Sequence, residues 1–307
     1  MEYRIGIDLG GTNISVGLVD GTCRVAAERK AKTRAPRPAE EIVADMAAMI
    51  SSLREETGIT PASVGIASPG IIEGRTVLTA GNLRFHNTPL ADLLERACGL
   101  PVALYNDAAA AVMGECAAGA GKGCSSVTMV TLGTGVGGGI ITGGRIADGI
   151  DGRGGELGHF VLVPGGLPCT CGKCGCFETY ASATALIRQT RAAMENDRSS
   201  LLWEEAGDPS TVSGRTAFDA MRRGDETAAA VVEGYVEYLA RGLVYVTNAV
   251  HPELLVIGGG IAGEGEALLT PVRAAMERMD PAAAASVMLA VSALGRQAAV
   301  IGAAYPI

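Results

Sequence analysis

The sequence lacks the features that direct a protein into a membrane or onto nucleic acid. No apolar run reaches the roughly 18 residues that a membrane-spanning helix needs, and the N-terminal segment MEYRIGIDLGG has neither a charged leader nor a long apolar stretch with a cleavage site. The 25 lysine and arginine residues are outnumbered by 33 acidic residues, which gives a net charge of −8. No basic surface is therefore expected for a phosphate backbone. We expect a soluble, cytoplasmic protein that binds neither nucleic acid nor membrane.

The length of 307 residues exceeds what a single hydrophobic core usually supports, which predicts two domains with a cleft between them. We expect a smaller α/β domain over residues 1–115, joined by a C-terminal helix at about 293–307 that returns to it. A larger α/β domain is expected over residues 116–292. Residues 3–20 and 126–141 both have the pattern of strand, glycine turn and strand, which suggests duplicated domains.

Hydrophobic periodicity predicts the other elements. Short buried strands are expected at residues 64–67, 102–105 and 254–257, and helical patterns cover residues 38–57, 108–118, 180–195, 226–247, from about 266, and 295–304. Polar residues follow two of these strands directly, in SPG at Ser68 and in ND at Asn106.

Four of the eight cysteines fall within eight residues, in the segment HFVLVPGGLPCTCGKCGCFE that begins at His159. Zinc takes four nitrogen and sulfur ligands in a tetrahedron, and this loop supplies such a set. We choose His159, Cys169, Cys171 and Cys176, although Cys174 could replace one of them. A disulfide pair is the alternative, but such crowded thiols would be reactive in an intracellular protein without a metal. A complete shell of thiolate and imidazole ligands leaves no place for water, so a structural zinc is expected.

Two glycine turns are candidates for binding phosphate. In the first, backbone amides and the Thr12 hydroxyl could approach a phosphate, while the carboxylate of Asp8 holds Mg²⁺ directly or through water. The second turn, around Thr134, offers similar donors. Either turn alone could be a hairpin that only needs positive φ, but the pair predicts a clamp on the phosphates of a nucleotide. The predicted clamp comprises Asp8, Gly10, Gly11, Thr12, Asn13, Gly133, Thr134 and Gly135.

The stretches that begin at Gly133 and Gly258 both match the dinucleotide fingerprint G-x-G-x-x-G. The first precedes a strand, which breaks the motif. After the second, the next acidic candidate, Asp280, follows helical residues and does not end a second strand. A nicotinamide-dependent activity is therefore disfavoured. We expect Gly258, Gly259 and Gly260 to let the purine ring or ribose of an adenosine lie against bare backbone instead.

Asp107 is the candidate catalytic base. The neighbouring Asn106 could hold a sugar hydroxyl while Asp107 takes its proton, and a helix-capping pair is the alternative. Glu156 and His159 are three residues apart in GGELGH and would face the same way on a helical turn, and Glu178 comes two residues after the last cysteine of the loop. Carboxylates and imidazole suit a ligand rich in hydroxyls, so the predicted ligand is a sugar.

Taken together, these motifs resemble those of the ROK family of repressors, open reading frames and kinases, within the actin-like ATPase superfamily. The resemblance covers nearly the whole chain. It rests on DLGGT from Asp8, SPG from Ser68, ND at Asn106, LGTGVGGGI from Leu132, GGELGH from Gly154 and CTCGKCGCFE from Cys169. It implies a two-domain actin-like ATPase (ribonuclease H-like) fold with mixed sheets flanked by helices, and a homodimer.

The resemblance also implies an activity, namely phosphoryl transfer from ATP·Mg²⁺ to the 6-hydroxyl of a hexose, with Asp107 as base. Glucose is the expected sugar, with N-acetylglucosamine, N-acetylmannosamine, allose and fructose as alternatives, and polyphosphate stays open as the donor. The repressors carry an additional helix-turn-helix domain, for which a first strand at about Tyr3 leaves no room. A sensor without catalysis is disfavoured, because the predicted base and phosphate residues are all present. The implied sugar-binding residues are Gly70, Asn82, Asn106, Asp107, Glu156, His159 and Glu178, and His159 also ligates zinc.

Overall fold

A computed structural model describes residues 2–306 of the chain. These residues form two compact units. The first unit takes the residues up to Met129, the segment Gly139–Gly155 and the residues from Ser292 onward. The second takes Val130–Gly138 and Glu156–Val291. The expected mixed α/β class is confirmed.

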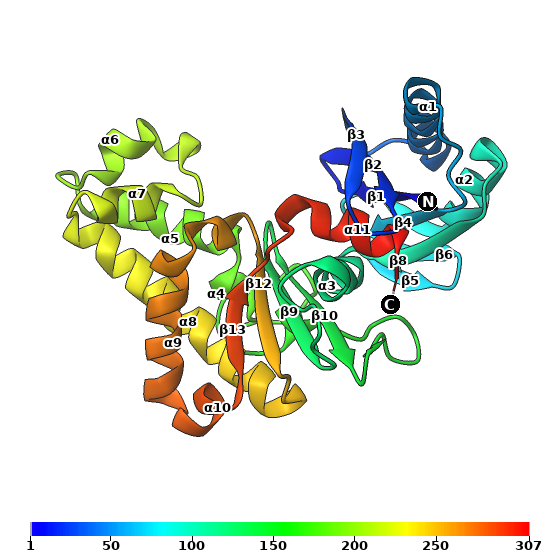
Figure 1. Cartoon of the computed structure of the whole chain (residues 1–307). Helices are drawn as coiled ribbons and strands as arrows, with labels where there is room; N and C mark the ends of the chain where they lie inside the picture. Colours follow the sequence, from blue (N-terminus) through cyan, green and yellow to red (C-terminus); the bar gives the residue numbers. More distant parts are fainter. Residues whose placement is uncertain (1, 307) are drawn as a thin grey trace. The chain divides into compact units, whose positions relative to one another are not determined.

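The first unit is built on a mixed sheet, drawn mainly in blue and cyan in Figure 1. Its strands are, in spatial order, β3 (Val25–Lys32), β2 (Asn13–Asp20), β1 (Tyr3–Leu9), β4 (Val64–Ser68) and β8 (Val102–Asn106). β1 and β2 form the predicted antiparallel hairpin, with Leu9 opposite Ile14 across the turn. β4 runs parallel to β1, and β8 runs parallel to β4. The carboxyl ends of β1, β4 and β8 therefore meet at one edge, where the DLGGT, SPG and ND motifs begin in the last residues of the strands.

Amphipathic helices cover this sheet. α1 (Ala39–Thr57) buries Ile42, Met46, Ile50 and Leu53 at helical spacing against the sheet residues. It ends at Gly58, whose φ of 68° places it in the left-handed region that favours glycine. α2 (Leu90–Cys98) also contacts α1. A small antiparallel sheet of β5 (Ile71–Glu73), β6 (Thr76–Ala80) and β7 (Phe85–Thr88) lies between β4 and α2 in the sequence.

The C-terminal helix packs on the unit that contains the N-terminal strands. α11 (Ala298–Ala304) contacts α3 (Asp107–Ala118), β1 and β4 (Figure 1). Glycines make this close approach possible, because a Cβ at Gly6 or Gly65 would overlap the carbonyl group of Val300 or Ala303. Backbone therefore lies directly on backbone at these two positions.

A second sheet has the strand order β11 (Arg145–Ile146), β10 (Val136–Thr142), β9 (Val127–Leu132), β12 (Leu254–Gly259) and β13 (Met288–Val291). β9 and β10 are neighbours joined by the glycine turn, as predicted for residues 126–141. β12 and β13 are parallel.

Helices surround a large core in the second unit, which includes the fully buried Tyr235, Phe177 and Phe218. α8 begins after Asp225, whose carboxylate accepts a 2.6 Å hydrogen bond from the Ala228 amide. The helices are α4 (Glu178–Ala181), α5 (Ala183–Asn196), α6 (Leu202–Ala206), α7 (Thr216–Arg222), α8 (Glu226–Val250), α9 (Glu266–Met279) and α10 (Pro281–Ser286). Short 3-10 turns lie at η1 (Leu157–His159), η2 (Pro209–Thr211), η3 (Gly260–Glu264) and η4 (Gly295–Gln297).

One helix prediction needs correction. The pattern over residues 180–195 predicts a continuous helix, but the chain ends α4 at Ala181 and starts α5 at Ala183. The buried Ser182 between them has an extended backbone, and its hydroxyl accepts a 3.0 Å hydrogen bond from the Ala185 amide. Serine favours this N-cap role over a helix interior, because its hydroxyl competes for backbone groups.

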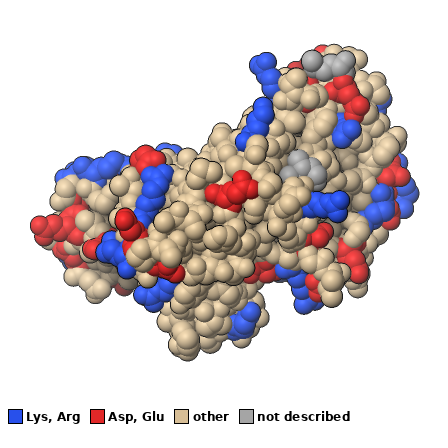
Figure 2. Space-filling model, turned by 60° about the horizontal axis from the view of Figure 1, so that its bottom comes forward, with Lys and Arg blue, Asp and Glu red and all other residues tan. Residues whose placement is uncertain are grey.

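Lysine and arginine side chains are interspersed with aspartate and glutamate on the face drawn in Figure 2. Within residues 2–306, no helix has the length and apolar character to span a membrane.

Candidate active site

Asn106 and Asp107 lie where β8 becomes α3. The Asn106 Oδ1 atom accepts hydrogen bonds from the amides of Ala108 at 2.9 Å and Ala109 at 3.1 Å, which makes it the N-cap of the helix. Its Nδ2 atom donates one bond to the Gly70 carbonyl at 3.1 Å. The capping alternative and the sugar-binding prediction are compatible, because an amide nitrogen carries a second N–H that can donate elsewhere. Asp107 follows in the first helical turn, where the helix dipole favours negative charge.

Asp8 is close enough to Asp107 for their charges to interact. Burial, and next the negative charge of Asp107, raise the pKa of Asp8 to about 6. The negative charges of Asp8 and Asp107 repel each other. A cation bound between them would stabilise the charged form of both carboxylates.

The first glycine turn is held in a defined shape. The Gly10 amide donates to the Asn13 carbonyl at 2.9 Å. The fully buried Thr33 donates its hydroxyl to the Gly10 carbonyl at 2.6 Å and its amide to the Thr12 carbonyl at 2.9 Å. The exposed Asn82 lies against the turn, because a Cβ at Gly11 would come within 3.0 Å of the Asn82 Cβ.

Position 70 requires a glycine for two reasons. Its φ of 97° is in the region that L side chains rarely adopt, and a Cβ there would overlap the Thr79 carbonyl oxygen. The Gly70 backbone therefore fixes the Asn106 amide through the bond described above.

The second glycine turn is bound to the start of α5 and to α4. The carbonyl of Gly133 accepts from the Ala183 amide at 2.9 Å, and the carbonyl of Thr134 accepts from the Thr184 hydroxyl at 2.7 Å. Just after the turn, the Val136 amide donates to the Glu178 Oε2 atom at 3.0 Å. Any side chain at Gly135 would overlap this carboxylate.

Gly258, Gly259 and Gly260 lie where β12 passes into η3. Gly259 has a φ of 85°, and a Cβ on it would overlap the backbone of Leu132. At Gly260, by contrast, a Cβ would have no atom of the described chain within 4 Å. The backbone at Gly260 is therefore open to a ligand.

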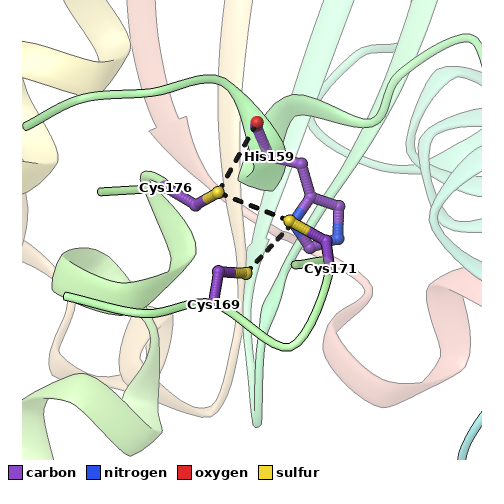
Figure 3. Close-up of side chains that lie close together, drawn as sticks. All are labelled: His159, Cys169, Cys171 and Cys176. Atoms are coloured by element: carbon purple, nitrogen blue, oxygen red, sulfur yellow. Dashed lines mark hydrogen bonds between the residues drawn. The ribbon is translucent and has the colours of Figure 1, made fainter. Parts of the chain in front are cut away.

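Figure 3 shows His159, Cys169, Cys171 and Cys176 with their donor atoms turned toward one another. These donor atoms all lie within 4.8 Å of each other. The sulfurs of Cys171 and Cys176 are 3.6 Å apart, and the Cys169 sulfur is 3.6 Å from His159 Nδ1. A regular zinc tetrahedron has edges of about 3.8 Å between sulfurs and about 3.6 Å between sulfur and nitrogen. The four residues therefore fit a tetrahedral metal ion.

The thiols also favour a cation chemically. Burial raises the pKa of Cys169 and takes that of Cys176 to about 12, so these thiols stay neutral unless a positive charge compensates them. A bound zinc ion deprotonates its cysteine ligands. Cys174 is exposed and is not a member of the donor group.

His159 connects the donor group to Glu156. Its Nε2 atom, on the side of the ring away from Nδ1, lies 3.8 Å from Glu156 Oε2. This separation is too long for a direct hydrogen bond. Because both residues belong to the turn at η1, the predicted common orientation is observed.

The predicted residues thus form one group in each unit. The first unit contains Asp8, the DLGGT turn, Gly70, Asn82, Asn106 and Asp107, and the second contains Gly133 to Gly135, Glu156, His159, Glu178, the cysteines and Gly258 to Gly260. The sequence reasoning missed Thr33 and Thr184, which anchor the two turns. Thr33 directly follows Lys32, the residue opposite Asn13 in the β2–β3 ladder, so recognition of β3 would have revealed it.

The mixed α/β fold, the paired glycine turns and the neighbouring carboxylates of Asp8 and Asp107 define a phosphoryl-transfer enzyme of the two-domain actin-like ATPase class. A model of the ROK family matches residues 4–306. The chain therefore belongs to the ROK family.

Similar proteins agree with this assignment. A glucokinase of Thermotoga maritima is 38% identical over 98% of this chain and 95% of its own length. A glucokinase of Streptomyces coelicolor is 36% identical over 91% of this chain and 88% of its own. The crystal structure of a ROK family glucokinase from Streptomyces griseus, in complex with glucose and AMPPNP, superposes with a TM-score of 0.88 at 35% identity and covers 98% of both chains.

Proposed function

We propose that this chain is a glucokinase, which transfers the γ-phosphoryl group of ATP to the 6-hydroxyl of glucose. Its similarity to glucokinases along nearly the whole chain supports both the reaction and the sugar. The observation that carries the proposal is the position of Asp107 at the start of α3, beside Asp8 and the end of β1.

In the proposed mechanism, Asp107 accepts the proton of the attacking hydroxyl as general base. The second N–H of Asn106 donates to a sugar hydroxyl, while its other polar atoms stay bonded to α3 and Gly70. Glu156, His159 and Glu178 bind further sugar hydroxyls from the second unit, with Gly70 and Asn82 as additional contacts from the first. The glycine turns hold the phosphates, and Gly258 to Gly260 hold the adenosine. When bound, Mg²⁺ near Asp8 neutralises charge on the phosphates.

The metal in the cysteine loop is proposed to be a structural zinc, held by His159, Cys169, Cys171 and Cys176. The tetrahedral edge lengths and the raised pKa values of the buried thiols support it. With Nδ1 directed to the metal, Nε2 of His159 is oriented toward Glu156, where a sugar hydroxyl can bridge the two. A homodimer is proposed from family membership alone, and light scattering of the purified protein tests it.

A coupled assay of ADP release tests the function. We expect rapid turnover with ATP·Mg²⁺ and glucose, and slower turnover with N-acetylglucosamine, N-acetylmannosamine, allose and fructose. Measuring glucose 6-phosphate formation with polyphosphate in place of ATP identifies the donor. Preference for another hexose would change the assigned sugar, and no sugar-stimulated turnover in zinc-replete protein would contradict the kinase proposal.

The variant Asp107→Asn tests the base. Asparagine has nearly the same shape but accepts no proton, so kcat should fall by about 10²- to 10⁴-fold. The affinity for glucose, measured by calorimetry, should change much less, because the hydrogen bonds of Asn106 are retained. A variant that kept full turnover would exclude Asp107 as the base.

A further inference from the structure

The two glycine turns are held by the same arrangement of hydrogen bonds, and each arrangement lies within one unit. At the first turn, Thr33 donates its hydroxyl to the Gly10 carbonyl at 2.6 Å and its backbone amide to the Thr12 carbonyl at 2.9 Å. At the second turn, Thr184 donates its hydroxyl to the Thr134 carbonyl at 2.7 Å, and the adjacent Ala183 amide donates to the Gly133 carbonyl at 2.9 Å. In both places a threonine hydroxyl and a backbone amide bind two carbonyls of the turn.

These bonds determine where the amides of the turns point. A trans peptide is planar, so its carbonyl and its N–H point in opposite directions. The Gly133 and Thr134 carbonyls are directed toward α5, and the N–H groups of Thr134 and Gly135 in the same peptides are therefore directed away from it. Consecutive N–H groups that point to one side form a concave site for an anion.

The start of α5 is itself well fixed. Ser182 caps the helix through the Ala185 amide, and Glu178 binds the Val136 amide at the far side of the turn. Thr184 is the second residue of α5 and is exposed. It is nevertheless bonded to a carbonyl 50 residues away in the sequence. This hydrogen bond therefore fixes the Thr134 carbonyl of the turn and links no two residues within α5.

We propose that Thr184 is a positioning residue for the phosphoryl donor, and that Thr33 has the same role at the first turn. By holding the carbonyls of its turn, each threonine directs N–H groups toward the phosphates of the nucleotide. The proposal rests on the function proposed above, in which these turns bind the phosphates of ATP.

The test compares Thr184→Val, which removes the hydroxyl but retains the shape, with wild type and Thr184→Ser. ADP binding is measured by calorimetry without sugar, and KM is measured separately for ATP and glucose. Loss of one hydrogen bond should weaken ADP binding and raise the KM for ATP by about three- to tenfold. The KM for glucose should stay within about twofold of wild type, and the serine variant, which keeps the hydroxyl, should restore ADP binding.

Thr190→Val is the matched control, because Thr190 lies on the same helix and donates its hydroxyl to Leu186 within it. It should bind ADP like wild type. Thr33→Val should weaken ADP binding in the same direction as Thr184→Val. If Thr184→Val binds ADP as tightly as wild type, the positioning role is wrong although the kinase stands. If wild type itself binds no ADP and shows no sugar-stimulated turnover, the proposed function is wrong instead.

Discussion

At the scale of single residues, Asp8 has a cost in stability that its proposed function explains. Its pKa is about 6 in the folded chain, above the value of 3.8 for an ordinary aspartate. The folded state therefore binds a proton more tightly than the unfolded state, so the protonated carboxyl favours folding below about pH 4 and this contribution is lost as the pH rises through 6. Above that window the carboxylate is charged, as the proposed binding of a magnesium ion requires.

We expect Asp8→Asn to unfold with a free energy about 1–3 kcal/mol higher than wild type at pH 7.5, because the buried charge is removed. The difference should shrink by pH 5, where wild-type Asp8 is mostly protonated. Urea unfolding at the two pH values measures this, with Glu55→Gln on the exposed surface of α1 as a control. The same Asp8 variant should be stabilised less by Mg²⁺·ADP. A variant less stable than wild type at pH 7.5 would contradict the assigned cost.

At the scale of elements, the cysteine loop should act on the sugar through His159. Removal of the proposed zinc by a chelator should free the imidazole, and we expect the KM for glucose to rise by about 10- to 100-fold. Cys171→Ser should lose the metal and show the same change. Cys174→Ser is the matched control, because Cys174 is an exposed thiol of the same loop outside the donor group.

Atomic spectrometry gives the metal content of each variant beside its kinetics. Cys174→Ser should retain one zinc per chain and the wild-type KM. If it loses the metal, Cys174 belongs to the ligand set. If metal-free wild type binds glucose normally, the loop does not position His159.

Hydrophobic periodicity and the positions of glycines predicted those strands and helices whose sequence pattern lies within the element itself. The β1–β2 hairpin and the β9–β10 turn follow from strand periodicity interrupted by glycines, and the carboxyl-end position of Asn106 follows from a buried strand before a helix. β3 went unrecognised because Val25–Lys32 carries Glu28, Arg29 and Lys30, so an edge strand with little apolar surface has no hydrophobic signal. The break at Ser182 was missed because apolar spacing continues across the cap.

In the candidate site, too, only the features that depend on residues close in the sequence could be predicted. The choice of His159, Cys169, Cys171 and Cys176 required only ligand chemistry within one loop, and the structure groups these four side chains. The roles of Thr33 and Thr184 depend instead on hydrogen bonds to carbonyls 23 and 50 residues away. Such pairings are set by tertiary packing and leave no mark in the local sequence.

At the scale of the whole molecule, Glu115 ties the end of the chain to the first unit. Its fully buried carboxylate accepts from the amides of Ala120 at 2.7 Å and Leu294 at 3.0 Å, from that of Ala293 at 3.2 Å, and from the Ser292 hydroxyl. These last three partners are 177 to 179 residues away in the sequence. The chain re-enters the first unit at Ser292, just before α11.

Glu115→Ala removes a fully buried carboxylate and leaves its four hydrogen-bond donors without this acceptor, which costs free energy. We therefore expect the free energy of unfolding to fall by about 1–3 kcal/mol, whereas Glu55→Ala on the exposed surface should change it by less than about 0.5 kcal/mol. Glu115→Gln keeps one acceptor oxygen and should lose less than alanine does. Urea unfolding measures the stabilities, and hydrogen exchange at Ala293 and Leu294 should accelerate first, because their amides lose their acceptor. If exchange there were unchanged while stability fell, the carboxylate would not be what fixes this segment, and α11 would be held by its close packing on β1 and β4 alone.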